Sequence, residues 1–241
     1  MATSREGMVL VPAGPFLMGS NEFARETPPH TVDLPAFWMD RYPTTSQEYL
    51  AFVEATGHRA PVDWVDGRPR PGFERHPVMV TWTDADAYAR WAGKRLPTEA
   101  EWEKAARGTD GRRYPWGNEW DITRALTWET VAPTGVRTEP VDARPSSASP
   151  YGCEQMVGLL EEWCQDWYDA YEGSDYHSQG YGERFKVLRG GAWIFTQTHA
   201  RCAYRCFELA SRPPEEMEVL GAPTFRCSAD AQPGDDLEAA S

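Results

Sequence analysis

The segment that decides the fold reads Trp91-Ala-Gly-Lys-Arg-Leu-Pro-Thr-Glu-Ala-Glu-Trp-Glu-Lys-Ala-Ala-Arg-Gly108. Thr98 followed three residues later by Glu101 is the pattern of a capping box, which predicts a helix that begins at this point. Gly108 is a typical helix stop. The apolar face of this helix is expected to consist of Trp102, Ala105 and Ala106.

The same spacing of a threonine and an acid occurs twice upstream of this segment. The two copies are Thr45 with Glu48 and Thr83 with Asp86. Each precedes a short apolar stripe and a glycine, so the sequence predicts two more helices, over residues 45–57 and 83–93.

Outside these helices the apolar residues follow neither a helical nor a strand period for long, and 20 Gly, 20 Pro and 11 Trp interrupt the pattern. We therefore expect an α+β fold that is irregular and loop-rich, with few short helices and short strands. Expected strands lie at residues 8–12, 37–42, 78–82 and 186–190. Residues 132–150 are expected to form a surface connection, residues 1–230 a single domain, and residues 231–241 a disordered acidic tail.

The net charge limits the kinds of partner that the chain is expected to bind. Its 37 acidic and 24 basic residues give a formal net charge of -13, which repels nucleic acids and anionic lipids and favours a cationic partner. No stretch approaches the roughly 18 apolar residues of a membrane span, and none has the form of a signal peptide, so we expect a cytoplasmic protein without nucleic-acid or membrane partners. The five cysteines are expected to be reduced and mostly buried.

Several segments, in one co-linear order over residues 7–230, resemble the formylglycine-generating enzyme or sulfatase-modifying factor family. They are Val9-Pro-Ala-Gly-Pro-Phe-Leu-Met-Gly-Ser20, His76-Pro-Val, the segment quoted above, Tyr114-Pro-Trp-Gly-Asn118, Pro140-Val-Asp, Val187-Leu-Arg-Gly-Gly-Ala-Trp193 and Phe225-Arg-Cys227. The resemblance implies a C-type-lectin-like core. It does not settle function, because the family includes oxidases, sulfoxide synthases and non-catalytic binders.

The resemblance also implies where a copper site would lie. In the oxidases of the family, two cysteines five residues apart, shortly after Arg-Gly-Gly, hold copper through soft thiolates. Counted forward from Gly191, these positions are Phe195 and Ala200; counted back from Cys206, the second falls on Arg201. Neither register supplies a thiol pair, so copper is not expected. The remaining weak candidates for a catalytic or metal-binding role are Cys202, Cys206 and His199.

Calcium is the one cofactor that the resemblance leaves open. Family members carry an Asn-Met-x-Gly-Asn-Val-Trp-Glu-Trp-like segment whose oxygens hold a hard cation. Here Gln155, Gly158 and Glu162 stand at matching positions, whereas Leu159 replaces a polar side chain. These three residues are the calcium candidates.

The sequence favours a non-catalytic protein that recognises a protein or small-molecule partner through the diverged loops after Gly191, and a toxin-neutralising immunity protein would be one example. The expected contact residues are Trp193, Phe195, Gln197, His199, Glu215 and Glu216. Two alternatives remain open. One is a metal- and oxygen-dependent oxidoreductase, using copper or iron, that acts on a thiol or an amine, and the other is a diversified lectin-like variable protein that binds ligands.

Overall fold

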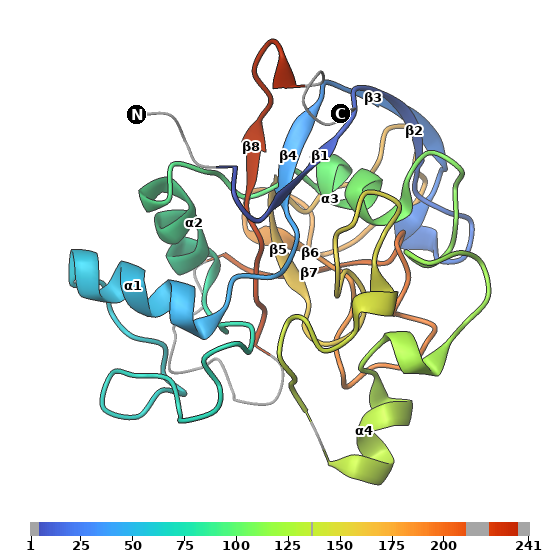
Figure 1. Cartoon of the computed structure of the whole chain (residues 1–241). Coiled ribbons are helices and arrows are strands. Elements are labelled where there is room, and N and C mark those ends of the chain that lie inside the picture. The colour runs from blue at the N-terminus through green and yellow to red at the C-terminus, as the bar shows by residue number, and fades with distance from the viewer. Residues whose placement is uncertain (1–4, 136, 211–221, 236–241) are drawn as a thin grey trace.

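The computed structural model describes residues 5–135, 137–210 and 222–235, in which short helices and strands are joined by long loops (Figure 1). The expected loop-rich α+β fold is confirmed. The helices are α1 Ser46–Thr56, α2 Trp82–Trp91, α3 Glu99–Arg107 and α4 Trp128–Thr134. The strands are β1 Met8–Val11, β2 Gly14–Met18, β3 His30–Leu34, β4 Phe37–Asp40, β5 Glu162–Trp167, β6 Phe185–Arg189, β7 Arg205–Leu209 and β8 Ser228–Asp230.

The described strands form three small antiparallel sheets. Their orders are β1-β4-β8, β2-β3 and β5-β6-β7. In the first sheet β4 lies between β1 and β8, with Met39 opposite both Val9 and Ser228. Strands from the two ends of the described chain therefore share one sheet.

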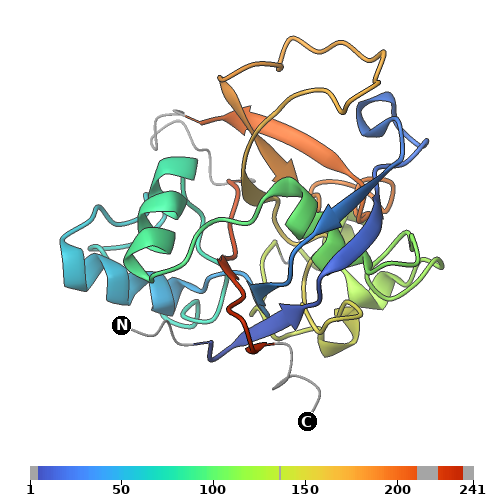
Figure 2. The same ribbon diagram turned by 90° about the horizontal axis from the view of Figure 1, so that it is seen from above.

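Helix α3 lies between the sheets and contacts β2, β5 and β6, while α1 and α2 pack together on one flank (Figures 1 and 2). Trp102 of α3 is fully buried in the main hydrophobic core. Gly190 explains how closely the end of β6 approaches this ring. Its φ is 90°, and a Cβ there would meet the Met156 carbonyl oxygen at 2.6 Å and the Trp102 ring at 3.2 Å, so the position requires glycine.

The predicted caps of two helices are confirmed. Thr45 and Glu48 form a capping box on α1, and Thr98 and Glu101 form one on α3. In each box the threonine hydroxyl accepts the N–H of the acid, and the acid's carboxylate accepts the threonine N–H. These contacts satisfy backbone donors that the first helical turn leaves open.

The start predicted for the second helix was wrong by two residues. The N-cap of α2 is Thr81, whose hydroxyl accepts the N–H of Asp84, and not Thr83. The same threonine-to-acid spacing occurs at both places, but only Asp84 is also held by Arg59 at 2.8 Å and His58 at 2.8 Å. Tertiary ion pairs thus select between two locally equivalent starts.

The strand predicted at residues 78–82 was also wrong. Val78 donates to the carbonyl oxygen of Thr44, whereas Val80 donates to that of Pro223, so the segment bonds to two different partners and forms no ladder. Helix α4, with Pro133 inside it, was not predicted and includes residues 132–134 of the expected surface connection. Of the expected disordered tail, residues 231–235 are placed, and residues 236–241 lie outside the described residues.

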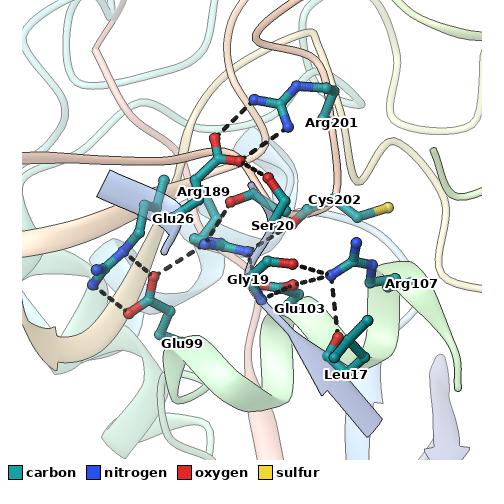
Figure 3. Close-up of polar contacts among 12 residues, drawn as sticks. Leu17, Gly19, Ser20, Glu26, Glu99, Glu103, Arg107, Arg189, Arg201 and Cys202 are labelled. Carbon is teal, nitrogen blue, oxygen red and sulfur yellow. Dashed lines mark hydrogen bonds and ion pairs between the residues drawn. The ribbon is translucent and has the colours of Figure 1, made fainter. Parts of the chain in front are cut away.

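A buried ion network joins α3 to the third sheet (Figure 3). Arg189 of β6 donates to Glu99 at 3.0 Å and also to Glu103, both on α3. Arg205 of β7 makes a bidentate pair with Glu99 at 2.7 and 2.8 Å. Glu103 accepts further bonds from Arg107 and from the Gly19 N–H, each at 2.8 Å. The side chains of Arg189, Arg205, Glu99 and Glu103 are all buried.

Two further buried pairs extend this pattern. Arg201 donates two hydrogen bonds to Glu26, at 3.0 and 2.7 Å. Arg226 donates two to Glu162, from Nε and Nη2, each at 2.7 Å. The Trp102 indole N–H also donates to Glu162 at 2.8 Å. Such pairs fix segments that regular secondary structure does not hold, because a buried charge without its partner is strongly destabilising.

We expect Glu103→Gln to lower the free energy of unfolding by about 3 kcal/mol or more, because the amide keeps the shape of the side chain but leaves Arg189 and Arg107 without a shared counter-charge. Urea unfolding followed by circular dichroism measures this loss. Glu54→Gln is the matched control, because Glu54 pairs with Arg68 at the exposed surface and such a pair contributes about 1 kcal/mol or less. Equal losses in the two variants would contradict a structural role for the network.

Candidate functional site

The loop after β6 places two of the expected contact residues in one group of rings. The His199 ring stacks on Phe195 at 5.0 Å and on Phe23 at 5.9 Å between ring centroids, and it meets the Tyr204 ring edge-on at 5.1 Å. We call these four residues the aromatic cluster. Gly191 sets the start of the loop, since its φ is 68° and a Cβ there would meet the His199 carbonyl oxygen at 2.8 Å.

His199 is neutral at physiological pH. Burial lowers its pKa, and the neighbouring charges of Arg25 and Arg201 lower the pKa further. Its Nδ1 is buried without a hydrogen-bond partner among the described residues. A neutral imidazole has one donor and one acceptor nitrogen, and its tautomer decides which role the buried Nδ1 has.

Arginine side chains frame the aromatic cluster. The Arg25 guanidinium lies 5.7 Å from the Phe23 ring centroid and 5.5 Å from that of Tyr204. Arg201 stands at the position that the backward count gives to the second thiol. It forms an ion pair with Glu26, and its guanidinium lies 4.9 Å from the Phe23 ring centroid. The cluster is therefore a group of rings and guanidinium planes, of the kind that recognises flat or charged groups, in which Phe23, Phe195 and His199 are partly exposed and Tyr204 is buried beneath them.

The other expected contact residues lie elsewhere. Trp193 packs with Leu126, Val131, Leu159 and Leu160 in a separate core group. The Gln197 N–H donates to Glu129 at 3.0 Å. Glu215 and Glu216 fall outside the described residues.

The candidate thiols do not come together. Cys202 is fully buried in the main core, whereas Cys206 packs against a second core group that includes residues of α1, α2, β5 and β6. Phe195 and Ala200 occupy the forward-counted thiol positions and supply no metal ligand. No group of three or more His, Cys, Asp and Glu side chains in the described ranges is arranged to hold a metal ion. These residues do not fit the copper site that the resemblance implies.

The calcium candidates also form other contacts. Both oxygens of Glu162 are bonded to Arg226, and one also accepts from Trp102. The Gln155 amide nitrogen donates to Glu139 at 3.0 Å, and its oxygen is buried without a partner among the described residues. Because Glu162 already neutralises a buried arginine, the arrangement does not fit a calcium site.

Sequence reasoning missed three residues of this region: Phe23, Arg25 and Tyr204. The first two precede β3 and meet the loop after β6 only in the folded chain. No local pattern marks them, because a ring contact between distant segments has no period or spacing. Tyr204 lies beside Arg205 of the ion network, and the backbone position of that arginine sets where the tyrosine ring lies.

None of the helices in the described ranges combines the length and the apolar character that a membrane span requires.

Comparisons with known proteins agree with this geometry. The chain matches the model of the sulfatase-modifying factor enzyme 1-like domain over residues 1–227. It is 35% identical to the formylglycine-generating enzyme of Streptomyces coelicolor, over 95% of this chain and 90% of that protein. It is 39% identical to the serine/threonine-protein kinase pkn1 of Chlamydia caviae, over 82% of this chain but only 35% of that protein. The chain thus spans about a third of the length of this kinase relative.

Solved structures share the fold. PvdO from Pseudomonas aeruginosa matches with a TM-score of 0.73 and 28% identity, over 93% of this chain and 94% of that chain. Treponema denticola variable protein 1 matches with a TM-score of 0.70 and 20% identity, over 93% and 95%, which shows a common fold alone. From its match over residues 1–227 and its identity to nearly full-length relatives, the chain belongs to the sulfatase-modifying factor enzyme 1-like family.

Proposed function

We propose that this chain is a non-catalytic binding protein whose recognition surface is the aromatic cluster and the loop that carries it. The observation that carries the proposal is the pair of side chains at the forward-counted metal positions of the family. Phe195 and Ala200 donate no thiolate, and the Phe195 ring instead stacks on His199. A site that presents aromatic faces in place of soft ligands is suited to contact and not to oxygen activation.

The state of the remaining thiols supports this proposal. Burial raises the pKa of Cys202 to about 12, and burial with the nearby Glu161 charge raises that of Cys206 to about 11. The thiolate is the nucleophile and the metal ligand. Both groups are therefore protonated thiols at neutral pH.

The partner that fits this proposal is a cationic protein or ligand, because the net charge of -13 attracts positive charge over the Debye length. A basic toxin neutralised by this chain is one such partner. A cytoplasmic location is supported by the five cysteines, which are all unpaired.

The alternative, an oxygen-dependent oxidoreductase acting on a thiol or an amine, is supported by the names of relatives. Besides the formylglycine-generating enzyme, these include hercynine oxygenase of Mycolicibacterium thermoresistibile, which is 34% identical over 82% of this chain and 54% of that protein. In this chain such chemistry would draw on Cys202, Cys206 or His199, of which Cys206 and His199 both contact Tyr204. A variable protein that displays diversified residues has only the shared fold in its support.

The binding protein and the oxidoreductase are expected to differ in whether they bind copper. We expect the wild-type chain to lose Cu(I) to a chromophoric chelator, and Phe195→Cys/Ala200→Cys to retain about one equivalent, because two thiolates then stand at the family positions. Chelator absorbance measures retention. The single variants Phe195→Cys and Ala200→Cys serve as controls and are expected to bind weakly. If wild type retained copper and consumed oxygen with a cysteine peptide, the oxidoreductase would replace the binding protein.

The recognition surface has its own test. In pull-downs from lysate of the source cells, we expect wild type to capture a stoichiometric partner and Phe195→Ala to bind the purified partner at least roughly tenfold more weakly, as for an interface hot spot. Ile194→Ala is the matched control, because Ile194 is an exposed neighbour outside the aromatic cluster. A partner that both variants bind as wild type does would place recognition elsewhere.

Glu161 makes the stability of this region depend on pH. Burial, together with the negative charge of Glu208, raises its pKa from 4.5 to about 7. The carboxyl therefore binds a proton more tightly in the folded chain than in the unfolded chain. Below pH 4.5 this carboxyl does not lower the free energy of unfolding. As the pH rises towards about 7 the free energy of unfolding decreases, and at higher pH the destabilisation stays constant.

We expect Glu161→Gln to match wild type near pH 4.5 and to be more stable at pH 8, by up to roughly 3 kcal/mol. Thermal unfolding at a series of pH values measures this difference. Glu172→Gln, at an exposed acid, should show no such divergence. A stability difference that does not change with pH would show that Glu161 stays ionised throughout.

A further inference from the structure

A pocket lies between the loop that follows α1 and the segment that follows α4. Its volume is about 430 Å³, within the range of small-molecule sites. Its apolar lining includes the buried side chains of Leu160 and Trp193, with Met79, Trp64 and Phe73. Of the four described loop residues expected to bind a partner, Trp193 alone lines this pocket, so the pocket is distinct from the aromatic cluster.

Tertiary contacts hold the pocket walls in place. His76 Nδ1 lies 3.2 Å from the Thr138 hydroxyl, which links the two segments. The Phe73 ring packs on His76 at 4.5 Å between centroids, and the His76 N–H donates to the Phe73 carbonyl oxygen. The pocket is therefore formed before any ligand enters, which lowers the entropic cost of binding.

One carboxylate oxygen in this lining lacks a partner. Asp63 Oδ1 is buried, and no group of the described chain donates to it. Burial also raises the pKa of Asp63. A buried acceptor left unpaired is costly, and a cationic donor from a ligand would satisfy it with a charge-assisted hydrogen bond.

Two guanidinium groups line the same pocket. Arg70 is close enough to Asp63 for its charge to lower the pKa of that carboxyl, although no hydrogen bond joins them. Arg137 lies over the Trp193 ring at 5.3 Å from the centroid. Within the described ranges neither arginine makes an ion pair with an acid. Each therefore has donors available for an anionic group.

We propose that this pocket binds an aromatic α-amino acid, with its ammonium on Asp63, its carboxylate on Arg70 and its ring in the apolar part formed by Leu160, Trp64 and Trp193. An α-amino acid carries its ammonium and its carboxylate on the same carbon atom, so the two charges lie close enough together to meet a neighbouring carboxylate and guanidinium at once. A simple amine would leave Arg70 unsatisfied, and a simple acid would leave Asp63 unsatisfied.

Isothermal titration calorimetry at pH 7 tests this with L-phenylalanine, phenethylamine and 3-phenylpropionate. We expect wild type to bind L-phenylalanine more tightly than either analogue. Asp63→Asn should weaken L-phenylalanine and phenethylamine by roughly tenfold or more and leave 3-phenylpropionate nearly unchanged, whereas Arg70→Gln should do the reverse for the two analogues. This crossed pattern separates charge recognition from a general loss of structure.

Asp66→Asn is the matched control. Asp66 is an exposed acid on the same loop, outside the pocket lining, and its φ of 52° suits asparagine. This variant should bind like wild type, and thermal unfolding should show all three variants folded. The proposal is overturned if wild type binds none of the three compounds at millimolar concentration, or if Asp63→Asn and Asp66→Asn bind L-phenylalanine equally. Neither result depends on copper binding or on the aromatic cluster, so the proposed function is tested separately.

Discussion

The contact of Arg189 with Glu99 and Glu103 holds this structure together. It links α3, which contacts β2, β5 and β6, to the end of β6, from which the candidate site loop departs. Regular hydrogen-bond ladders here are short, and most of the chain between them is loop. Charged pairs in a dry interior are directional and are expensive to break. They therefore set where loops lie, a task that longer sheets perform in other folds.

The buried ion network and the loop side chains that could recognise a partner are therefore separate parts of the structure. Four arginines pair with acids inside the molecule, at positions 189, 201, 205 and 226. The side chain of Phe195, which lies between them in the sequence, takes no part in these pairs. Loop side chains such as Phe195 can therefore vary without disturbing the network. The same scaffold is found in proteins named as enzymes and in a variable protein, which is consistent with function changing through a few loop positions.

Local signals in the sequence predicted the helices α1 and α3, because their capping boxes are complete within four residues. The start of α2 required knowledge of the pairs that Asp84 makes with His58 and Arg59, which no local pattern contains. Two residues of the candidate site could be selected from the sequence. Phe195 and His199 were identified from their place after the Arg-Gly-Gly motif, but their ring partner Phe23 comes from another part of the chain. The pocket beside Trp193 was not predicted, since its lining residues come from five separate segments of the chain.

The pairing of β8 with β4 has a consequence for how the protein is made. Ser228 and its neighbours complete a sheet whose other two strands come from the first forty residues of the chain. Arg226, the partner of the buried Glu162, lies in the same late segment. This sheet and this ion pair therefore cannot close until residues 226–230 have left the ribosome, and the apolar side chains that β8 covers stay exposed until then. Nascent chains of this protein are thus expected to depend on chaperones until the final strand emerges.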